Sequence, residues 1–377
     1  MIILFSIITS LYVILISILL VAYQKVKPIK WESTLPKTRF TVIIPFRNEA
    51  HNLQDLLLSI GKIHYPHSLF EIILVDDDSE DNSVEIIKSY INKNQENLLD
   101  ISIAKNERRS HSPKKDAIQT AILKAKYEWI ITTDADCIVL SSWLLCFDQF
   151  ISTKAPKLIV APVTYKVSNS IIDNFQLHDF LSLQTATVGG FGIGNPFLCN
   201  GANLCYAKST FHELNGFIGN DNIASGDDLF LLEKITNRYP KDVHFIKSKN
   251  AIVYTNPEPK LKALFNQRVR WASKTSAYNN LLSKLLAIIV LLMNASLVVC
   301  FVFAMLGLTS WLMLTVLFVV KLCVDFLFII KSSQFFKQNS SLIFYPLNSL
   351  IYPIFVVSVS CYSMFFTFKW KGRYFKK

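Results

Sequence analysis

Uncharged stretches at both ends of the chain constrain its fold more than any other feature of the sequence. Residues 2–23 carry no charged side chain, and about 20 apolar residues are enough to cross a bilayer as a helix. Nothing basic precedes this stretch and Lys25 and Lys27 follow it, whereas a cleaved signal peptide has a basic start, a shorter apolar core and a small-residue cleavage site. We therefore predict a retained membrane anchor over residues 1–24.

Three more apolar stretches follow Trp271. Residues 285–306 and 311–330 are each long enough to form a membrane-spanning helix. The second contains Lys321 and Asp325, whose spacing puts both side chains on one face of a helix. Because charges inside a membrane are costly unless they are paired or functional, we predict an ion pair directed at the other helices.

The last apolar stretch, residues 341–368, conflicts with a simple crossing. If the domain after the anchor faces the cytoplasm, a third C-terminal crossing would put the basic residues 369–377 outside, against the positive-inside tendency. The stretch holds Pro346 and Pro353, which can break a helix. We therefore predict membrane segments over residues 283–368 that end in a bent hairpin or an interfacial helix. Residues 369–377 would then form a basic cytoplasmic tail.

Most of the net charge of +11 lies beside these apolar stretches. Residues 25–39 contain five basic residues and one acidic residue, and residues 369–377 contain five basic residues and no acidic one. Cytoplasmic flanks of membrane helices are enriched in Lys and Arg, which meet anionic lipid heads there. We expect an integral protein of the cell (inner) membrane with a cytoplasmic domain, and no nucleic-acid partner.

The seven cysteines contain no CxxC pair, and three of them lie in apolar stretches. This pattern indicates free thiols in a reducing compartment, and it disfavours a disulfide framework or a zinc site.

Residues 38–275 have the pattern of an α/β domain. Four short apolar runs read as buried strands, and stretches with helical periodicity separate them. The strands are expected at residues 39–45, 71–75, 100–104 and 128–133, and the helices after Asn48 (a candidate N-cap), around 84–91 and over 116–126. Such alternation predicts a mostly parallel sheet covered by helices.

Carboxylates follow these strands directly. The first strand runs into residues 45–49 (PFRNE), the second into 76–79 (DDDS) and the fourth into Asp134 and Asp136. Ligands of open α/β sheets bind beyond the carboxyl ends of the strands, and a divalent cation would relieve the repulsion within such a cluster. A solvated turn or a helix cap explains each piece alone, so the order and context carry the interpretation.

These segments resemble family-two inverting glycosyltransferases. Residues 41–49 (TVIIPFRNE), 72–79 (IILVDDDS) and 131–136 (ITTDAD) are similar to the nucleotide-sugar half of that family. Further along, residues 201–204 (GANL) and 215–217 (NGF) are similar to its acceptor segment. Residues 226–228 (GDD) are similar to its catalytic acidic pair, and 267–271 (QRVRW) match its QxxRW motif.

The resemblance spans residues 38–275 and implies a GT-A-like, mostly parallel sheet with helices on both faces, next to N-terminal and C-terminal transmembrane helices. It implies that Asp228 is the general base with Asp227 its neighbour, and that Asp136 with Asp134 holds Mg²⁺ or Mn²⁺. The implied donor contacts are Thr41, Pro45, Glu49, Asp76, Asp77, Lys114, Asp134 and Asp136, and the implied acceptor or diphosphate contacts are Asn203, Gln267, Arg270 and Trp271.

Structural alternatives accompany some of these roles. Residues 226–228 could simply cap the helix that follows them, and Trp271 with Arg270 could sit at a membrane interface. Position 78 is Asp where the family more often has Gly. The basic segment 108–115 is either a loop that contacts the diphosphate or a solvated surface.

The resemblance implies transfer of a sugar from a nucleotide sugar, most often a UDP-sugar, to a lipid-linked or glycan acceptor. GDP and dTDP donors stay open. A processive polysaccharide synthase is the alternative, although three C-terminal apolar stretches are few for a translocating pore. A nucleotidyltransferase would carry a Gly-rich phosphate loop after the first strand, and a degenerate membrane scaffold would have lost its charged motif residues; neither fits.

Overall fold

The computed structural model describes residues 2–29, 35–94, 99–168, 170–220, 223, 225–274, 277–366, 368–371 and 373–375. The chain forms two compact units. The α/β unit contains residues 27–166 and 198–256, and the helical unit contains residues 1–26, 167–197 and 257–377. The domain boundaries given above remain predictions. Of the basic flanks, Lys30, Lys376 and Lys377 lie outside the described residues.

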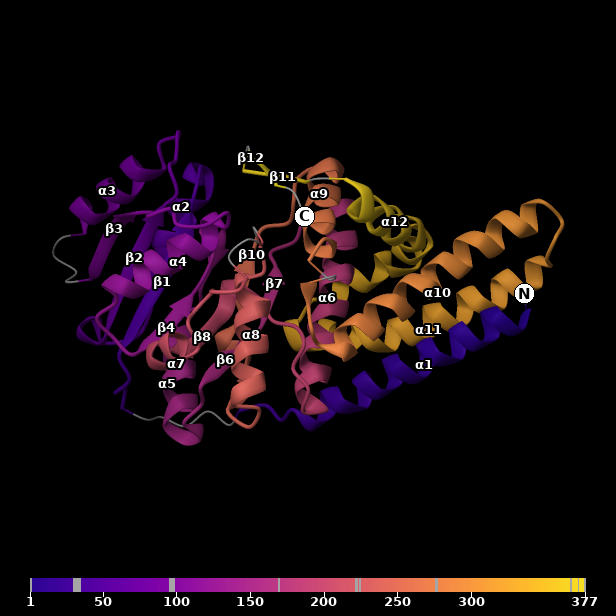
Figure 1. Cartoon of the computed structure of the whole chain (residues 1–377), viewed down its shortest axis with the longest axis horizontal. Helices are drawn as coiled ribbons and strands as arrows, with labels where there is room; N and C mark the ends of the chain where they lie inside the picture. The colour runs from indigo at the N-terminus through magenta and orange to yellow at the C-terminus, as the bar shows by residue number, and fades with distance from the viewer. Residues whose placement is uncertain are drawn as a thin grey trace. The chain divides into compact units, whose positions relative to one another are not determined.

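A seven-stranded sheet with the order β3-β2-β1-β4-β8-β6-β9 forms the centre of the α/β unit (Figure 1). β1 pairs in parallel with β2 and β4, β2 with β3, and β6 with β9, whereas β8 runs antiparallel to β4 and β6. The strands are β1 Phe40–Phe46, β2 Phe70–Asp76, β3 Asp100–Lys105, β4 Trp129–Thr132, β6 Leu158–Val160, β8 Leu204–Ala207 and β9 Val243–Phe245. The predicted mostly parallel sheet is confirmed, with four strands within a residue or so of the expected ranges.

Helices and a small second sheet complete this unit. The helices are α2 Ala50–Ile60, α3 Ser83–Lys93, α4 Pro113–Lys124, α5 Trp143–Lys154, α7 Lys208–Glu213 and α8 Asp227–Arg238, with 3-10 turns η1 His67–Leu69, η3 Gly201–Asn203 and η4 Lys249–Ala251. The small sheet has the order β5 (Cys137–Ile138), β10 (Val253–Thr255) and β7 (Val163–Tyr165). It joins the segment after Asp136 to the end of the unit.

Helix α2, the first helix of the α/β unit, has a different N-cap residue from the one predicted. Asn48 was predicted as its N-cap, but the N-cap is Glu49 and the helix begins at Ala50, so that prediction is wrong. Asn48 has a φ of 53°, a left-handed conformation that Asn tolerates better than most residues, and its side-chain oxygen accepts a hydrogen bond from the Glu80 N–H at 2.8 Å. It therefore ties the end of β1 to the segment after β2.

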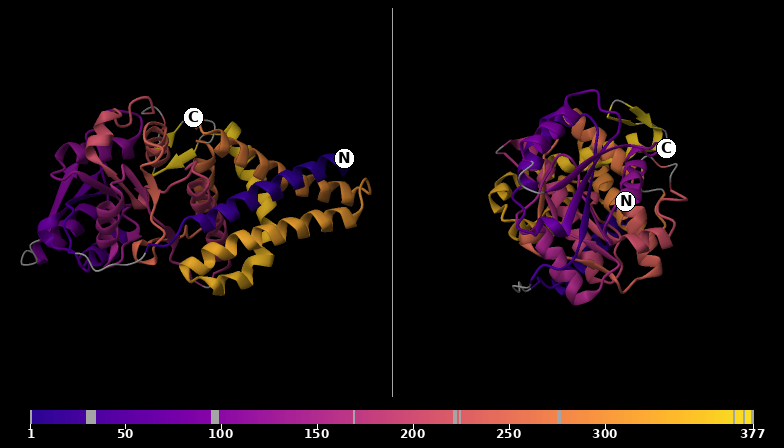
Figure 2. Two further views of the ribbon diagram at one scale, coloured as in Figure 1. Left: turned by 90° about the horizontal axis from the view of Figure 1, so that it is seen from below. Right: turned by 90° about the vertical axis from the view of Figure 1, so that its left-hand side faces the viewer.

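The helical unit is built from long apolar helices. It contains α1 Ile2–Lys25, α6 Ile171–Gly192, α9 Leu261–Ala272, α10 Leu281–Met305, α11 Trp311–Phe336, η6 Asn339–Phe344 and α12 Tyr345–Phe365, followed by the hairpin strands β11 Phe368–Trp370 and β12 Arg373–Phe375. Within the described residues, four helical stretches (those of α1, α10, α11 and η6 with α12) are long and apolar enough to cross a membrane. α1 packs against α10 and α11, and the three run side by side (Figure 2).

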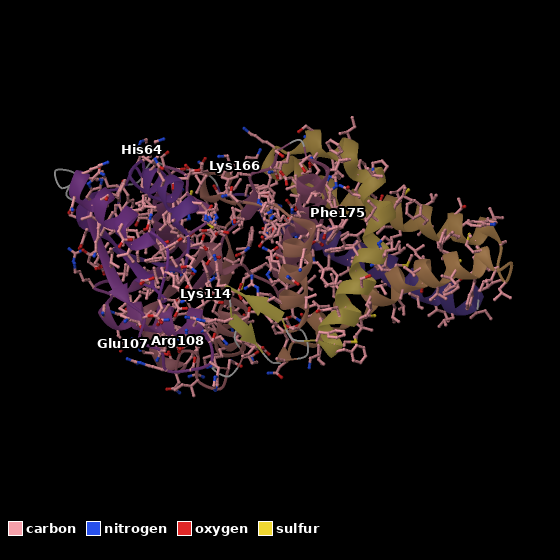
Figure 3. All side chains as sticks on the ribbon, turned by 90° about the horizontal axis from the view of Figure 1, so that it is seen from above. His64, Glu107, Arg108, Lys114, Lys166 and Phe175 are labelled. Carbon is pink, nitrogen blue, oxygen red and sulfur yellow. The ribbon has the colours of Figure 1, made fainter. Side chains whose placement is uncertain are left out.

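Glycines on α6 bring α1 close to it. A Cβ atom added at Gly192 would lie 1.9 Å from the Ala22 carbonyl oxygen, and one added at Gly189 would lie 2.8 Å from the Leu19 carbonyl oxygen. Small residues allow this close approach of helix backbones between apolar helices. On the same helix α6, Phe175 (labelled in Figure 3) packs its ring 5.1 Å from that of Phe355 on α12.

Of the two arrangements predicted for residues 341–368, the bent hairpin is wrong, because α12 continues as one helix from Tyr345 to Phe365; the interfacial helix remains a prediction. Pro346 lies in the first helical turn, where a missing N–H costs nothing. Pro353 lies inside the helix, and apolar bundles tolerate an internal proline because neighbouring groups satisfy the freed backbone. Proline position, and not proline count, decides the outcome. The cytoplasmic position of residues 369–377 remains a prediction.

Candidate active site

A half-buried lysine joins two of the predicted carboxylates at the carboxyl edge of the large sheet. The Lys114 ammonium, from the first turn of α4, lies 2.6 Å from the Asp134 carboxylate after β4 and 3.5 Å from the Asp227 carboxylate at the start of α8. Figure 3 labels Lys114 and the nearby Arg108 in this unit. Burial alone would lower the pKa of Lys114, but the Asp134 and Asp227 carboxylates, with Asp228, outweigh it and raise that pKa, so Lys114 is a cation among carboxylates.

Asp228 is held by backbone N–H groups. Its carboxylate accepts hydrogen bonds from the Gly201 N–H at 3.0 Å and from the Leu229 N–H at 2.8 Å. Gly201 leaves little room for a side chain at this point, because a Cβ atom there would lie 3.1 Å from the Asp227 carboxylate, which would have to move by a few tenths of an ångström. The helix N-cap is Gly226, which makes no side-chain cap bond. Asp227 and Asp228 contact the Lys114 ammonium and the Gly201 N–H, both outside α8, so their role is not limited to capping that helix.

Asp136 lies on the turn between β4 and β5. Its carboxylate accepts from the Thr255 hydroxyl at 3.2 Å and from the Cys137 thiol at 3.6 Å, and burial raises the pKa of Cys137, which keeps that thiol protonated. Asp134 and Asp136 are half-buried oxygen donors on one turn. No group of three or more His, Cys, Asp or Glu side chains suited to a metal occurs among the described residues. Two carboxylates plus phosphate oxygens are nevertheless the donor set that Mg²⁺ favours, so the residues present fit such an ion.

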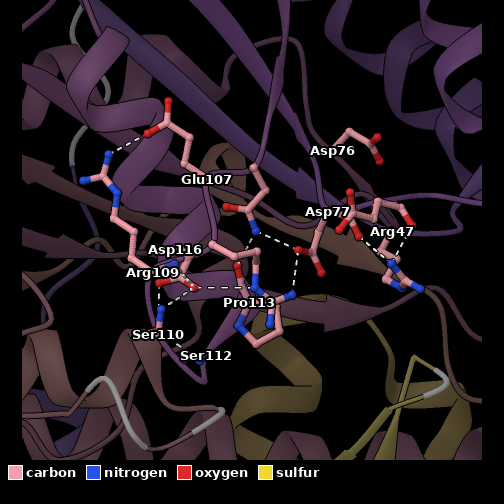
Figure 4. Close-up of polar contacts among 12 residues, drawn as sticks. Arg47, Asp76, Asp77, Glu107, Arg109, Ser110, Ser112, Pro113 and Asp116 are labelled. Atoms are coloured by element: carbon pink, nitrogen blue, oxygen red, sulfur yellow. Dashed lines mark hydrogen bonds and ion pairs between the residues drawn. The ribbon is translucent and has the colours of Figure 1, made fainter.

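The end of β2 forms a second polar cluster (Figure 4). Asp77 accepts from the Asn106 amide at 2.7 Å and from the Arg108 guanidinium at 3.0 Å, and Asp76 accepts from the Ser79 N–H at 2.9 Å. Arg108 also lies 3.6 Å from Asp116. Within the basic segment 108–115, Arg108 and Lys114 are thus bound to carboxylates.

The unusual Asp78 has a backbone explanation. Its φ is 58°, in the region that glycine enters freely and Asp tolerates. The side chain is exposed, with the Lys105 ammonium 3.9 Å away. The position therefore requires a residue that tolerates this turn, which accounts for a Gly-to-Asp difference.

The other predicted donor contacts divide by their place along β1. Pro45 is half-buried opposite Val75, and Glu49 is buried with its carboxylate accepting from Asn52 at 2.7 Å; both are at the carboxyl end. Thr41 lies near the amino end, fully buried, where its hydroxyl donates to Glu71 at 2.7 Å. The structure does not bring Thr41 to the edge that carries the carboxylates.

Asn203 is also in the core. It is fully buried, its amide donates to the Pro162 and Ala251 carbonyls at 2.8 Å each, and its oxygen accepts from the Trp143 indole at 2.9 Å. This geometry gives Asn203 a structural role and does not support its assignment as an acceptor contact.

The QxxRW residues lie on α9 in the helical unit. The Gln267 amide donates to the Glu258 carboxylate at 3.1 Å. Arg268, inside the motif, pairs with Asp179 at 2.6 Å and stacks 4.2 Å from the Trp271 ring centroid. Arg270 is half-buried on the same helix. Sequence reasoning missed Arg268, although its spacing from Trp271 puts the two on one helix face.

Comparison with known sequences agrees with the motifs. A sequence profile described as Glycosyl transferase family group 2 matches residues 129–368, and one described as Glycosyl transferase family 2 matches residues 41–195. The first covers more than half of the chain. The chain belongs to glycosyltransferase family 2. This family member is 24% identical over 229 residues to poly-beta-1,6-N-acetyl-D-glucosamine synthase of Staphylococcus epidermidis (60% of this chain, 52% of the relative).

Other relatives point to the same family. Glycosyltransferase AglE of Haloferax volcanii is 31% identical over 205 residues, which is 54% of this chain and 63% of AglE. TarS of Staphylococcus aureus, a poly(ribitol-phosphate) beta-N-acetylglucosaminyltransferase, is 32% identical over 98 residues, or 26% of this chain and 16% of TarS. The chain thus spans less than two thirds of these curated relatives.

A solved structure supports the fold. The mannosyltransferase PcManGT from Pyrobaculum calidifontis, in complex with GDP-Man and Mn²⁺, matches with a TM-score of 0.59 at 16% identity, over 92% of this chain and 99% of that one. The likeness confirms the GT-A-like fold class predicted from the sequence.

Proposed function

We propose that this family member is an inverting glycosyltransferase that moves a sugar from a nucleotide sugar to a lipid-linked or saccharide acceptor in glycan or polysaccharide synthesis. The observation that carries the proposal is the cluster of Asp134, Asp227 and Asp228 around the Lys114 cation. It combines a fixed positive charge at the start of α4 with carboxylates from two other parts of the chain, Asp134 after β4 and the adjacent Asp227 and Asp228 at the start of α8. Leaving-group stabilisation and proton abstraction need these two kinds of group side by side.

Asp228 supplies the base in this proposal. The acceptor hydroxyl gives its proton to the Asp228 carboxylate, and its oxygen bonds to the anomeric carbon. The bond from that carbon to the phosphate oxygen breaks, and the nucleoside diphosphate departs with the electron pair. The Gly201 and Leu229 N–H groups hold the carboxylate in one orientation, which keeps the base directed at the hydroxyl.

The leaving diphosphate needs positive charge. Lys114 is a cation at the edge of the sheet and would interact with the phosphates once a donor is bound. Asp136 and Asp134 would hold Mg²⁺ or Mn²⁺, which when bound stabilises charge on the phosphate oxygens. Asp76 and Asp77, with Pro45 and Glu49, would shape the base pocket.

The acceptor and the membrane remain part of the proposal. Gln267, Arg270 and Trp271 would contact the acceptor or the diphosphate. The apolar helices would place the α/β unit on the cytoplasmic side of the cell membrane, where the basic flanks meet anionic lipids. A processive synthase is the second candidate because one relative is named a poly-beta-1,6-N-acetyl-D-glucosamine synthase, but four candidate membrane spans among the described residues favour a limited transfer.

A donor and acceptor panel tests this function. The purified full chain in phosphatidylglycerol vesicles is incubated with UDP-N-acetylglucosamine, UDP-glucose or GDP-mannose, with chitotetraose or decaprenyl phosphate as the acceptor and Mn²⁺ or Mg²⁺ present. We expect one donor to release nucleoside diphosphate faster when an acceptor is added, and product length separates single transfer from polymerisation. A folded chain that binds and cleaves none of the donors contradicts the proposal.

A further inference from the structure

A connected series of part-buried polar contacts, here called the polar network, runs through the helical unit from its apolar helices to the QxxRW helix α9. Membrane helices gain nothing from polar groups except where those groups fix an arrangement or perform a function. The polar network contains four charged residues, which form two ion pairs: Arg268 with Asp179, and Lys321 with Asp325.

The first part of the polar network lies between α1 and α11. Lys321 and Asp325 form the predicted ion pair, one helical turn apart on α11, and the Lys321 side chain is only 4% exposed. The Tyr12 hydroxyl of α1 donates to the same Asp325 carboxylate at 2.5 Å. Removing either charge alone would leave the other buried without its partner, which is costly.

Tyr352 on α12 connects this ion pair to the next part of the polar network. Its ring centroid lies 5.2 Å from the Lys321 ammonium, a cation–π distance. Its hydroxyl donates to the Asp179 carboxylate on α6 at 3.0 Å. Tyr352 therefore contacts the ion pair of α11 through its ring and the carboxylate of α6 through its hydroxyl.

The last part reaches α9. Asp179 accepts from the Arg268 guanidinium at 2.6 Å, and that guanidinium covers one face of the Trp271 ring. The Trp271 ring also lies 6.3 Å from Phe180, next to Asp179 on α6. The orientation of Trp271 thus depends on Asp179, and Asp179 is fixed by Tyr352.

We propose that Asp179, Tyr352 and the Lys321–Asp325 pair are positioning residues that hold α9 and the Trp271 ring in the geometry used for the acceptor. The proposal rests on the proposed function for its acceptor role. A buried ion pair is a poor source of stability compared with apolar residues, and its best use is to select one arrangement. The pair would therefore contribute to acceptor binding more than to folding.

Two variants test this without destroying the fold. Tyr352→Phe removes one hydroxyl and keeps the ring. Lys321→Met with Asp325→Asn removes both charges and keeps an oxygen for the Tyr12 hydroxyl. Tyr362→Phe is the matched control, since Tyr362 is on the same helix, is 37% exposed and packs its ring 5.5 Å from Phe265 of α9.

Amide hydrogen exchange of the full chain in vesicles measures the positioning directly. We expect the α9 amides to exchange about tenfold faster in both test variants, with α10 and the control unchanged. We also expect the KM for the productive acceptor, chitotetraose or decaprenyl phosphate, to rise about tenfold with the donor KM unchanged. Wild-type exchange of α9, or faster exchange with an unchanged acceptor KM, overturns the proposal. If the wild-type protein transfers no sugar, the proposed function is contradicted instead. The exchange measurement then still decides whether the polar network holds α9 in place.

Discussion

An Asp228→Asn variant is expected to lose sugar transfer by about 10²–10⁴-fold while its affinity for the nucleotide sugar stays close to that of the wild type. Asn keeps the size of Asp228 and one oxygen that can accept the Gly201 N–H, and it gives up the bond from the Leu229 N–H at the part-buried first turn of α8, so the fold should persist. It has no group that accepts the proton of the acceptor hydroxyl. Single-turnover transfer and calorimetric donor binding measure the two properties separately.

Asp55→Asn is the control for this experiment, because Asp55 is an exposed residue of α2 in the same unit. It should behave as the wild type in both assays. If Asp228→Asn instead loses donor affinity, Asp228 is a donor ligand and its assignment as the base is wrong.

An Asp136→Ala variant is expected to lose transfer by about two orders of magnitude or more, because it removes a carboxylate proposed to hold the divalent ion. The side chain is half-buried on a turn, with the Thr255 hydroxyl 3.2 Å away, so the fold should survive. EDTA should inactivate the wild type, and titration with Mn²⁺ followed by electron paramagnetic resonance should show weaker ion binding in the variant.

Thr255→Val supplies the matched comparison for Asp136. It removes the hydroxyl bond and leaves the carboxylate, so most ion binding and activity should remain. A folded Asp136→Ala protein with wild-type turnover, or wild-type activity that is indifferent to EDTA, would show that the reaction does not depend on an ion at Asp136.

The sequence predicted the parts of the site that follow strands directly. Asp77, Asp134 and Asp136 each come after an apolar run, and parallel strands end at one edge, so their general position was accessible. The Lys321–Asp325 pair was predictable for a similar local reason, since four residues are one helical turn. In these places neighbouring residues and their spacing carry enough information.

Contacts between distant segments could not be predicted in the same way. The Gly201 N–H reaches Asp228 only because η3, just before the antiparallel strand β8, lies beside the start of α8, and Thr255 reaches Asp136 through pairing of β10 with β5. Neither the contact between η3 and α8 nor the pairing of β10 with β5 leaves a local signal in the sequence.

Two assignments from the family motifs did not match the geometry for reasons of direction and burial. Thr41 is four positions before Pro45 on β1, and that distance carries it away from the carboxyl end of the strand. Asn203 reads as a polar residue beside the site, yet its three hydrogen bonds bind it within the core. The bent hairpin was wrong because Pro346 falls in the first turn of α12. The pattern of apolar residues does not show where this helix begins, so it does not show which turn contains the proline.

The central claim is a single displacement at the anomeric carbon, with Asp228 as the base. NMR of the product formed from the donor that the panel selects tests it most directly, since the one-bond carbon–proton coupling constant at the anomeric carbon gives its configuration for every sugar in the panel. Transfer from an α-linked sugar nucleotide is predicted to give a β-linked product, with inversion in every turnover. An α-linked product would show retention of configuration and contradict a single displacement.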